Sequence, residues 1–366
     1  EATIKGGADV DAGGAVTIAA SDSSSIDAEL VAVAISVGGA SSVAINMAVG
    51  LALAENRIGS DVTAGIGNAT GPDGTVVDAQ SVDIDASNTT TINAIGVAVG
   101  FSGGGSGAVA VSGAGAGVKA RNEISGVTEA RIRAADVTTT GAVTVDARDD
   151  AAIDATLVSA SVALSLSGGA SVSIAVSVTL AENVLTGGAT AKIDGATVNA
   201  GGLVTVDARS TGTVDVVGVA AAFSLSAAGG VGVSGAGAGV EAINRVDSTT
   251  AALIEASTVE AGGPVTVNAL DDSEIDATLL SASISLGLGG AAGIAIAISV
   301  TLAENILTGA TLASIDNADV DATTVTVEAR STATIETEAI AAAVSVTASG
   351  GFSLSGAGTG AIARNT

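Results

Sequence analysis

Carboxylates are the side chains of this sequence whose type and spacing come closest to a chemical site. An acidic residue, replaced once by asparagine, recurs about every 61 residues along the chain. If the repeats stack, these carboxylates repel one another, and either solvent screening, raised pKa values or bound Ca²⁺ must relieve the repulsion. No EF-hand loop and no GGxGxD nonapeptide accompanies them. The candidate calcium ligands are Asp27, Asp154, Asp215, Asp276 and Glu336.

Other catalytic groups are scarce. The sequence has no His and no Cys, so it offers neither a Ser–His dyad nor a thiolate. The paired carboxylates Asp149-Asp150 and Asp271-Asp272 are expected in solvated turns that lead into strands. A net charge of −26, from 38 acidic and 12 basic residues, argues against binding to nucleic acid or to anionic membranes. We therefore expect no enzyme and no cofactor other than Ca²⁺.

A repeat organises the whole chain. The segment VTVDAR at Val143 recurs as VTVDAR at Val204, and its relatives are separated by 66, 61, 61, 61 and 60 residues. A fixed period of this kind indicates a solenoid in which each repeat forms one coil. Valine alternates with polar residues in each copy, which is typical of a strand with one buried face. The six coils begin near Val16, Val82, Val143, Val204, Val265 and Val325.

The coils alternate between two kinds. The first, third and fifth carry long Val/Ile/Leu strands, whereas the others carry GAGAG-type segments such as residues 235–239. We expect coils rich in large residues to stack beside coils rich in small ones, so that large side chains fill the space left by small neighbours. The predicted fold is an all-β parallel β-solenoid (β-helix) of six wide coils of about 61 residues in alternating pairs. Residues 1–366 form one continuous solenoid, which we interpret as a piece of a longer chain.

Two long uncharged runs need a separate interpretation. Thr156–Leu180 has the length of a membrane-spanning helix, but its large and small residues alternate with the period of a strand, and Gly168-Gly169 interrupts it. We therefore predict two strands joined by a turn, and no membrane insertion. Residues Gly65–Gly74, which lengthen the first repeat, are expected to form a surface loop.

One polar column also follows the period. Residues one coil apart lie about 4.8 Å apart in a stack, so asparagines at that spacing can bond amide to amide along the axis. The sequence predicts this structural ladder at Asn56, Asn122, Asn183, Asn244, Asn305 and Asn365.

The repeat IDGATVNAGGLVTVDAR, residues 193–209, resembles those of large secreted or surface-displayed bacterial β-solenoid proteins of the filamentous-haemagglutinin and autotransporter-adhesin type. The resemblance is one of composition and rhythm and covers all six coils. It implies an extracellular or cell-surface stalk, fibre or adhesin. The coils here are wider than is usual in that group, which favours a flattened solenoid or one with a projecting sheet.

Three functions are compatible with this sequence. The favoured one is a non-enzymatic structural protein, a segment of a β-solenoid filament whose copies associate laterally or end to end, with flat Ser/Ala/Gly faces as the lateral contacts. The second is an adhesin that binds carbohydrate, a host or a solid surface. The third is the stalk of an enzyme whose active domain lies elsewhere.

Overall fold

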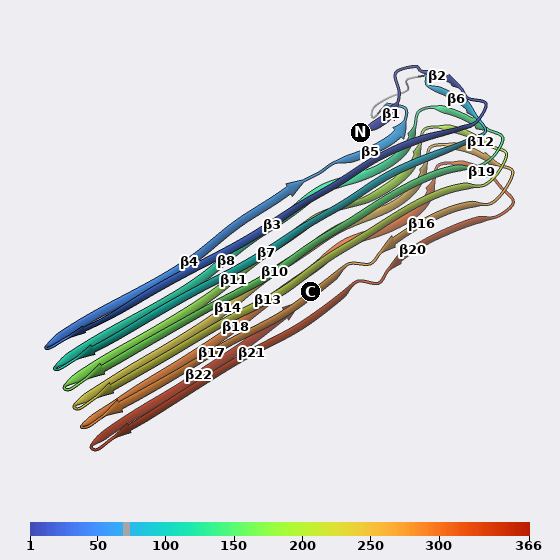
Figure 1. Ribbon diagram of the computed structural model, residues 1–366. Coiled ribbons are helices and arrows are strands. Elements are labelled where there is room, and N and C mark those ends of the chain that lie inside the picture. The colour runs from blue at the N-terminus through green and yellow to red at the C-terminus, as the bar shows by residue number, and fades with distance from the viewer. Residues whose placement is uncertain (69–73) are drawn as a thin grey trace.

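The computed structural model describes residues 1–68 and 74–366 and is an all-β parallel solenoid, as predicted (Figure 1). The described residues contain strands and no helix. Three parallel sheets of eight, eight and six strands run along the axis. Each coil runs along one long sheet to the opposite end of the molecule and turns there. It then returns along the other long sheet and passes through the short sheet before the next coil begins.

The strands are grouped by sheet, and the two long sheets are named for the direction in which the chain runs. The outgoing sheet contains β3 (Ala15–Ala40), β7 (Ser81–Ser106), β10 (Val143–Ser167), β13 (Val204–Ala228), β16 (Val265–Asp271), β17 (Glu274–Gly289), β20 (Val325–Ser331) and β21 (Thr334–Ser349). The return sheet contains β1 (Ala2–Ile4), β4 (Val43–Gly59), β5 (Val62–Ile66), β8 (Val109–Arg133), β11 (Ala170–Asp194), β14 (Val231–Glu255), β18 (Ala292–Asp316) and β22 (Phe352–Asn365). The short sheet contains β2 (Asp9–Asp11), β6 (Val76–Ala79), β9 (Asp136–Thr139), β12 (Thr197–Ala200), β15 (Thr258–Ala261) and β19 (Asp319–Asp321).

Residues one period apart are direct neighbours in the sheets. Val143 pairs with Val204 on the outgoing sheet, and Asn183 pairs with Asn244 on the return sheet. The pairing continues without a slip over the whole of β10 and β13. The period therefore sets the register of the stack, which confirms the prediction from spacing.

The short sheet divides the molecule into two parts (Figure 1). Where it is present, three sheets enclose a core; we call this part the head. Beyond it, the two long sheets continue alone, face to face, as far as the turns; we call this part the blade. The blade consists of residues 30–54, 94–118, 155–181, 216–240, 277–303 and 339–363, none of which is Asp, Glu, Lys or Arg.

The head has an ordinary apolar core. Ile84, Val145 and Val206 of the outgoing sheet, Ile193 of the return sheet and Val198 of the short sheet all have no exposed surface. Full burial of an aliphatic side chain of this size contributes about 1.5–3 kcal/mol. In the return strand β11, Gly187 has a φ of 143°, which favours glycine, and a Cβ there would overlap the carbonyl oxygen of Gly126.

The interior of the blade is small and polar. Ser159, Ser177 and Thr179 are fully buried between the sheets, and the hydroxyl of Ser159 lies 2.7 Å from that of Ser177 and 2.8 Å from that of Thr179. Ser173 donates to the backbone carbonyl of Ala163 at 2.7 Å. Because only Ser, Thr, Ala and Gly separate the sheets for most of this length, the sheets approach closely, and many of the hydroxyls bond to one another or to backbone carbonyls. The buried hydroxyls of Ser112, Ser161 and Ser283 have no hydrogen-bond partner.

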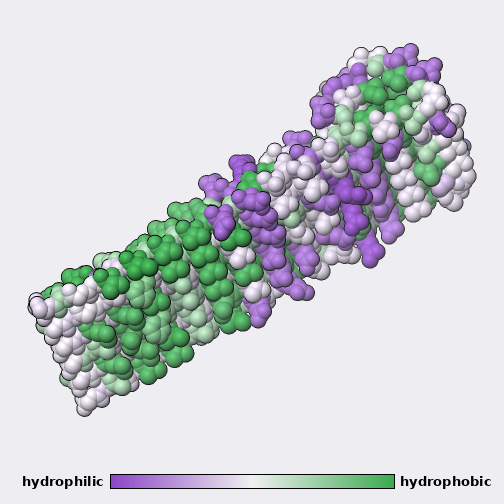
Figure 2. Space-filling model, viewed as in Figure 1, coloured by the Kyte–Doolittle hydropathy of each residue, from purple (hydrophilic) through white to green (hydrophobic). Residues whose placement is uncertain are grey.

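The large apolar residues of the blade point outward instead. Leu166 on the outgoing sheet is 54% exposed and Ile174 on the return sheet is 52% exposed. Figure 2 shows the resulting apolar surface over the half of the molecule that ends in the turns, whereas the hydrophilic side chains gather over the other half. The expectation that flat Ser/Ala faces lie at the surface is therefore wrong for this part, since those faces meet each other inside.

The predicted alternation of large and small coils is present inside the blade. Leu157 is buried and pairs with Gly96 in the coil below and Gly218 in the coil above. A Cβ built on Gly96 would lie 3.1 Å from Leu157 Cδ2, so the leucine occupies space that the glycine leaves. The close packing of the stack depends on this pairing of coils.

Two further predictions concern particular segments. Thr156–Leu180 lies in β10 and β11 and their connecting turn, as predicted, and no helix among the described residues is long and apolar enough to cross a membrane. The GAGAG segment at 235–239 is part of strand β14. Of the expected loop Gly65–Gly74, Gly65 and Ile66 end strand β5, and residues 69–73 lie outside the described part of the chain.

Candidate functional site

The asparagine column is a continuous hydrogen-bonded ladder in the return sheet. The Nδ2 of Asn122 donates to Oδ1 of Asn183 at 2.8 Å, and Asn183 donates to Asn244 in the same way. Asn56 begins the ladder and Asn305 carries it on to Asn365. Asn122, Asn183, Asn244 and Asn305 are fully buried. Each amide is therefore both donor and acceptor, and the ladder fixes the register of the coils where the blade joins the head.

The recurring acidic residues named as candidate calcium ligands, which we call the acidic file, lie on the outer surface of the outgoing sheet. Asp154 pairs with Asp215 and Asp215 pairs with Asp276, while the file ends at Asp27 and Glu336. All five carboxylates are exposed. Asn93 stands between the first two acids and donates from Nδ2 to Oδ1 of Asp27 at 2.7 Å.

The carboxylate in the middle of the acidic file, Asp215, has a raised pKa. Burial first, and then the charges of Asp276 and Asp154, raise the pKa of Asp215 above its ordinary value. No group of three or more acidic, His or Cys residues positioned to hold a metal ion occurs among residues 1–68 and 74–366. Calcium binding by Asp27, Asp154, Asp215, Asp276 and Glu336 stays a prediction, which calorimetric titration with CaCl2 tests.

One member of each acidic pair is buried, contrary to expectation. Asp149 and Asp271 are only 4% and 5% exposed. Strand β10 runs through residues 149 and 150 without a turn, so its alternation places the first carboxylate inside. Asp149 accepts hydrogen bonds from Nδ2 of Asn88 at 2.7 Å and from the Thr128 hydroxyl at 3.3 Å.

Burial also changes the acidity of these groups. Desolvation raises the pKa of Asp149 despite its hydrogen bonds to Asn88 and Thr128, and it raises the pKa of Asp271 in the same way. Asp146, half-buried beside Asp207, likewise has a raised pKa, chiefly through burial. In each case the low-dielectric surroundings favour the neutral acid.

The only buried cation among the described residues belongs to an ion-pair cluster in the head. Glu129 lies between Arg131 of its own strand and Lys192 of the next coil, with Lys192 Nζ 2.5 Å from its Oε1. Burial alone would raise the pKa of Glu129, but Lys192 and Arg131 together hold it below its ordinary value. This cluster joins the second coil to the third, and sequence spacing did not predict it.

Mild acid is expected to stabilise the protein. The raised pKa values of Asp146, Asp149, Asp215 and Asp271 mean that these acids bind protons more tightly when folded, so the free energy of unfolding rises as the pH falls from neutral through those values. As the pH falls further, the free energy of unfolding stops rising near 3.8, the ordinary pKa of these acids. At lower pH, Glu129 loses the stability that its lowered pKa provides.

Urea unfolding at several pH values between neutral and about 4 measures this effect. The control variant is Asp149→Asn, which keeps an acceptor for Asn88 and has no charge to desolvate. It should be more stable than the parent at neutral pH and show a flatter pH profile. A parent whose stability falls steadily from neutral pH downward would contradict the prediction.

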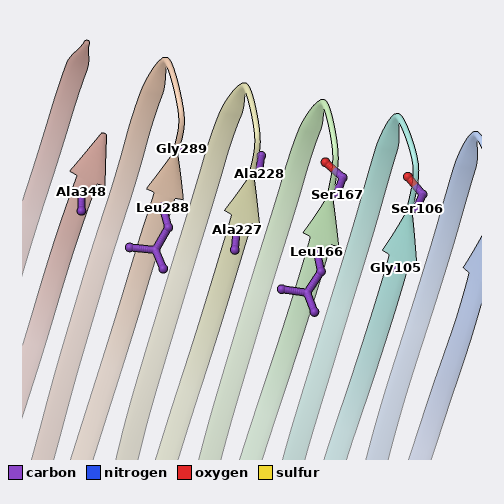
Figure 3. Close-up of a pocket in the computed structure, with 9 residues that line it drawn as sticks. All are labelled: Gly105, Ser106, Leu166, Ser167, Ala227, Ala228, Leu288, Gly289 and Ala348. Carbon is purple, nitrogen blue, oxygen red and sulfur yellow. The ribbon is translucent and has the colours of Figure 1, made fainter. Parts of the chain in front are cut away.

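A shallow groove of about 600 Å³ crosses the outgoing sheet at the end of the blade (Figure 3). The side chains of Leu166 and Leu288 stand out from alternate coils, with Ala227 between them. The hydroxyls of Ser106 and Ser167 are the only polar side-chain groups that line it. The groove thus offers apolar contact and no acid–base pair.

Comparisons with known proteins match this chain to no family model, no curated protein and no solved structure.

Proposed function

We propose that this chain is a segment of a rigid, non-catalytic β-solenoid fibre that works outside the cell or at its surface. One observation carries the proposal: each long strand pairs with the same strand of the next coil over nearly its whole length, as β10 does with β13. A rod built in this way grows by adding coils and keeps its cross-section. The resemblance to secreted bacterial solenoids supports the location.

The internal contacts support a load-bearing role. The asparagine ladder binds every coil to the next with hydrogen bonds of 2.8 to 3.0 Å. In the blade, hydroxyl contacts such as that between Ser171 and Ser226 connect neighbouring coils as well as the two sheets. Separating two coils therefore requires the simultaneous loss of three sheet ladders and of these side-chain bonds.

Insertion of one extra coil pair tests the proposal. A second copy of residues 143–264 placed after Pro264 keeps the alternation of coils and should lengthen the rod by about 10 Å with an unchanged cross-section. Small-angle scattering and negative-stain microscopy measure both quantities. Insertion of residues 143–203 alone is the matched control: it sets two Leu157-type residues in contact and should cost about 1–3 kcal/mol.

The two possible outcomes separate the proposed function from its rival. Straight rods that lengthen with the number of coil pairs support a fibre. Particles that do not lengthen, or that bind glycans or solid surfaces through their outer loops without forming rods, would overturn the proposal in favour of an adhesin.

A further inference from the structure

The outer face of the return sheet within the blade is corrugated. In the third coil, Ile174, Val176 and Val178 point outward, and each pairs with a glycine of the fourth coil. The same pairing of an outward large residue with a glycine repeats in the coil pairs on either side. We call the two kinds bulky rows and glycine rows. The bulky rows are 47–51, 174–178 and 296–300, and the glycine rows are 113–117, 235–239 and 356–360.

No contact within the chain requires glycine in the row of the fourth coil. A Cβ built on Gly235, Gly237 or Gly239 meets no atom within 4 Å, and none of the three has a φ in the left-handed region. Glycine inside a strand weakens it relative to residues with a side chain. The inward-facing Gly218 differs, because a Cβ there would lie 2.9 Å from Leu279. The outward glycines of the fourth and sixth coils therefore keep space open for something outside the molecule. In the second coil, by contrast, Val49 and Leu51 of the neighbouring strand lie over the glycine row, where a Cβ on Gly117 would come within 2.8 Å of Leu51.

The spacing of the rows indicates what fills that space. Neighbouring bulky rows lie two coils apart, about 9.6 Å, and the glycine rows lie between them with the same repeat. A second copy of this face has the same repeat and the same uncharged surface. A two-fold axis parallel to the strands, between the third and fourth coils, places every bulky row of one copy opposite a glycine row of the other. The same surface patch then serves both partners, as closed dimers require.

The size of this face is sufficient for a stable dimer. Six strands about 4.8 Å apart and about ten residues of about 3.3 Å each give roughly 900 Å² per copy. Specific protein interfaces bury about 800 Å² per partner. Ile174, Ile296 and Ile298 are 48–53% exposed and uncharged neighbours surround them, so docking would remove apolar surface from water without burying a charge.

We propose that the return-sheet face of the blade is a docking surface for a second copy of this chain, which packs its bulky rows into the glycine rows with the two blades pointing the same way. Along most of its length the outgoing face lacks this pattern, because Val97, Val158, Val219 and Leu280 follow one another from coil to coil. Only at the end of the blade do large and small residues alternate there, at Leu166, Ala227 and Leu288. Fluid lipid chains would gain nothing from rows of empty space. The inference rests on the proposed function, since it joins two rods into a double fibre.

Filling one glycine row tests the proposal. The triple variant Gly235→Val, Gly237→Val and Gly239→Val places side chains in open space on a strand, so the monomer should fold with an unchanged or higher Tm. Overpacked contacts should raise the dimer Kd about 10- to 100-fold, measured by sedimentation equilibrium. The matched control is Ala160→Val, Ala221→Val and Ala282→Val on the outgoing face, which should leave the dimer Kd unchanged.

Both triple variants place three valines on an outward face of the blade, so they separate specific packing from general stickiness. A parent that stays monomeric, or a dimer that survives the filled glycine row, would overturn the inference. So would flotation with phosphatidylcholine vesicles that increases when the row is filled, because that result indicates lipid as the occupant. Coil-pair insertion in the filled variant keeps the two proposals apart: rods that lengthen without pairing retain the fibre and remove only the docking surface.

Discussion

Replacing Asn183 with alanine is expected to lower the free energy of unfolding by about 2–6 kcal/mol, because it leaves two buried groups unsatisfied at about 1–3 kcal/mol each. The variant removes the acceptor of the Asn122 amide and the donor to the Asn244 carbonyl oxygen, both at 2.8 Å. None of the three side chains reaches solvent, so water cannot replace the lost partners.

Urea unfolding followed by circular dichroism measures this loss, and Asn199→Ala is its control. Asn199 lies on strand β12 with its side chain exposed, so its replacement should change stability by no more than about 0.5 kcal/mol. Equal stability of the two variants would show that the ladder does not hold the coils together.

The second large effect is expected for Leu157→Ala, at about 3–5 kcal/mol. Leu157 is 1% exposed and lies between Gly96 and Gly218, which have no side chains that could move into the cavity. The loss should therefore be near the upper end of the range for leucine-to-alanine changes in a core. Relaxation of the site is limited further by the two sheets, which remain fixed by their ladders.

The same unfolding measurement applies, with Leu203→Ala as the matched control. Leu203 is 41% exposed in the turn before β13, so its truncation leaves no cavity and should cost much less. If Leu157→Ala costs no more than this control, the alternation of large and small coils is not what packs the blade.

The sequence predicted the features that depend on the period. Recurrence at about 61 residues identified the coils, their alternation between large and small residues, and the asparagine ladder, because parallel in-register stacking turns equal spacing into direct contact. These predictions need no knowledge of which face of a strand is buried.

The orientation of the blade residues could not be predicted in the same way. Strand alternation presents one face of Val and Leu and another of Ser and Ala, and the usual rule buries the apolar one. The blade buries Ser159 and Ser173 instead, since two long sheets without a third between them can approach closely only through small residues. The burial of Asp149 was missed for a related reason: a pair of acids was taken as a turn, whereas the strand continues through it.

The absence of charge from the blade also limits where a protease that cleaves after Lys or Arg can act. All 12 Lys and Arg residues lie outside the six blade segments, so trypsin has no recognition site there. Cleavage within the head would separate the segments covalently, while the ladders between coils would still hold them in a stack. Digestion of such a fibre would begin at its polar side and leave a ribbon of noncovalently joined hairpins.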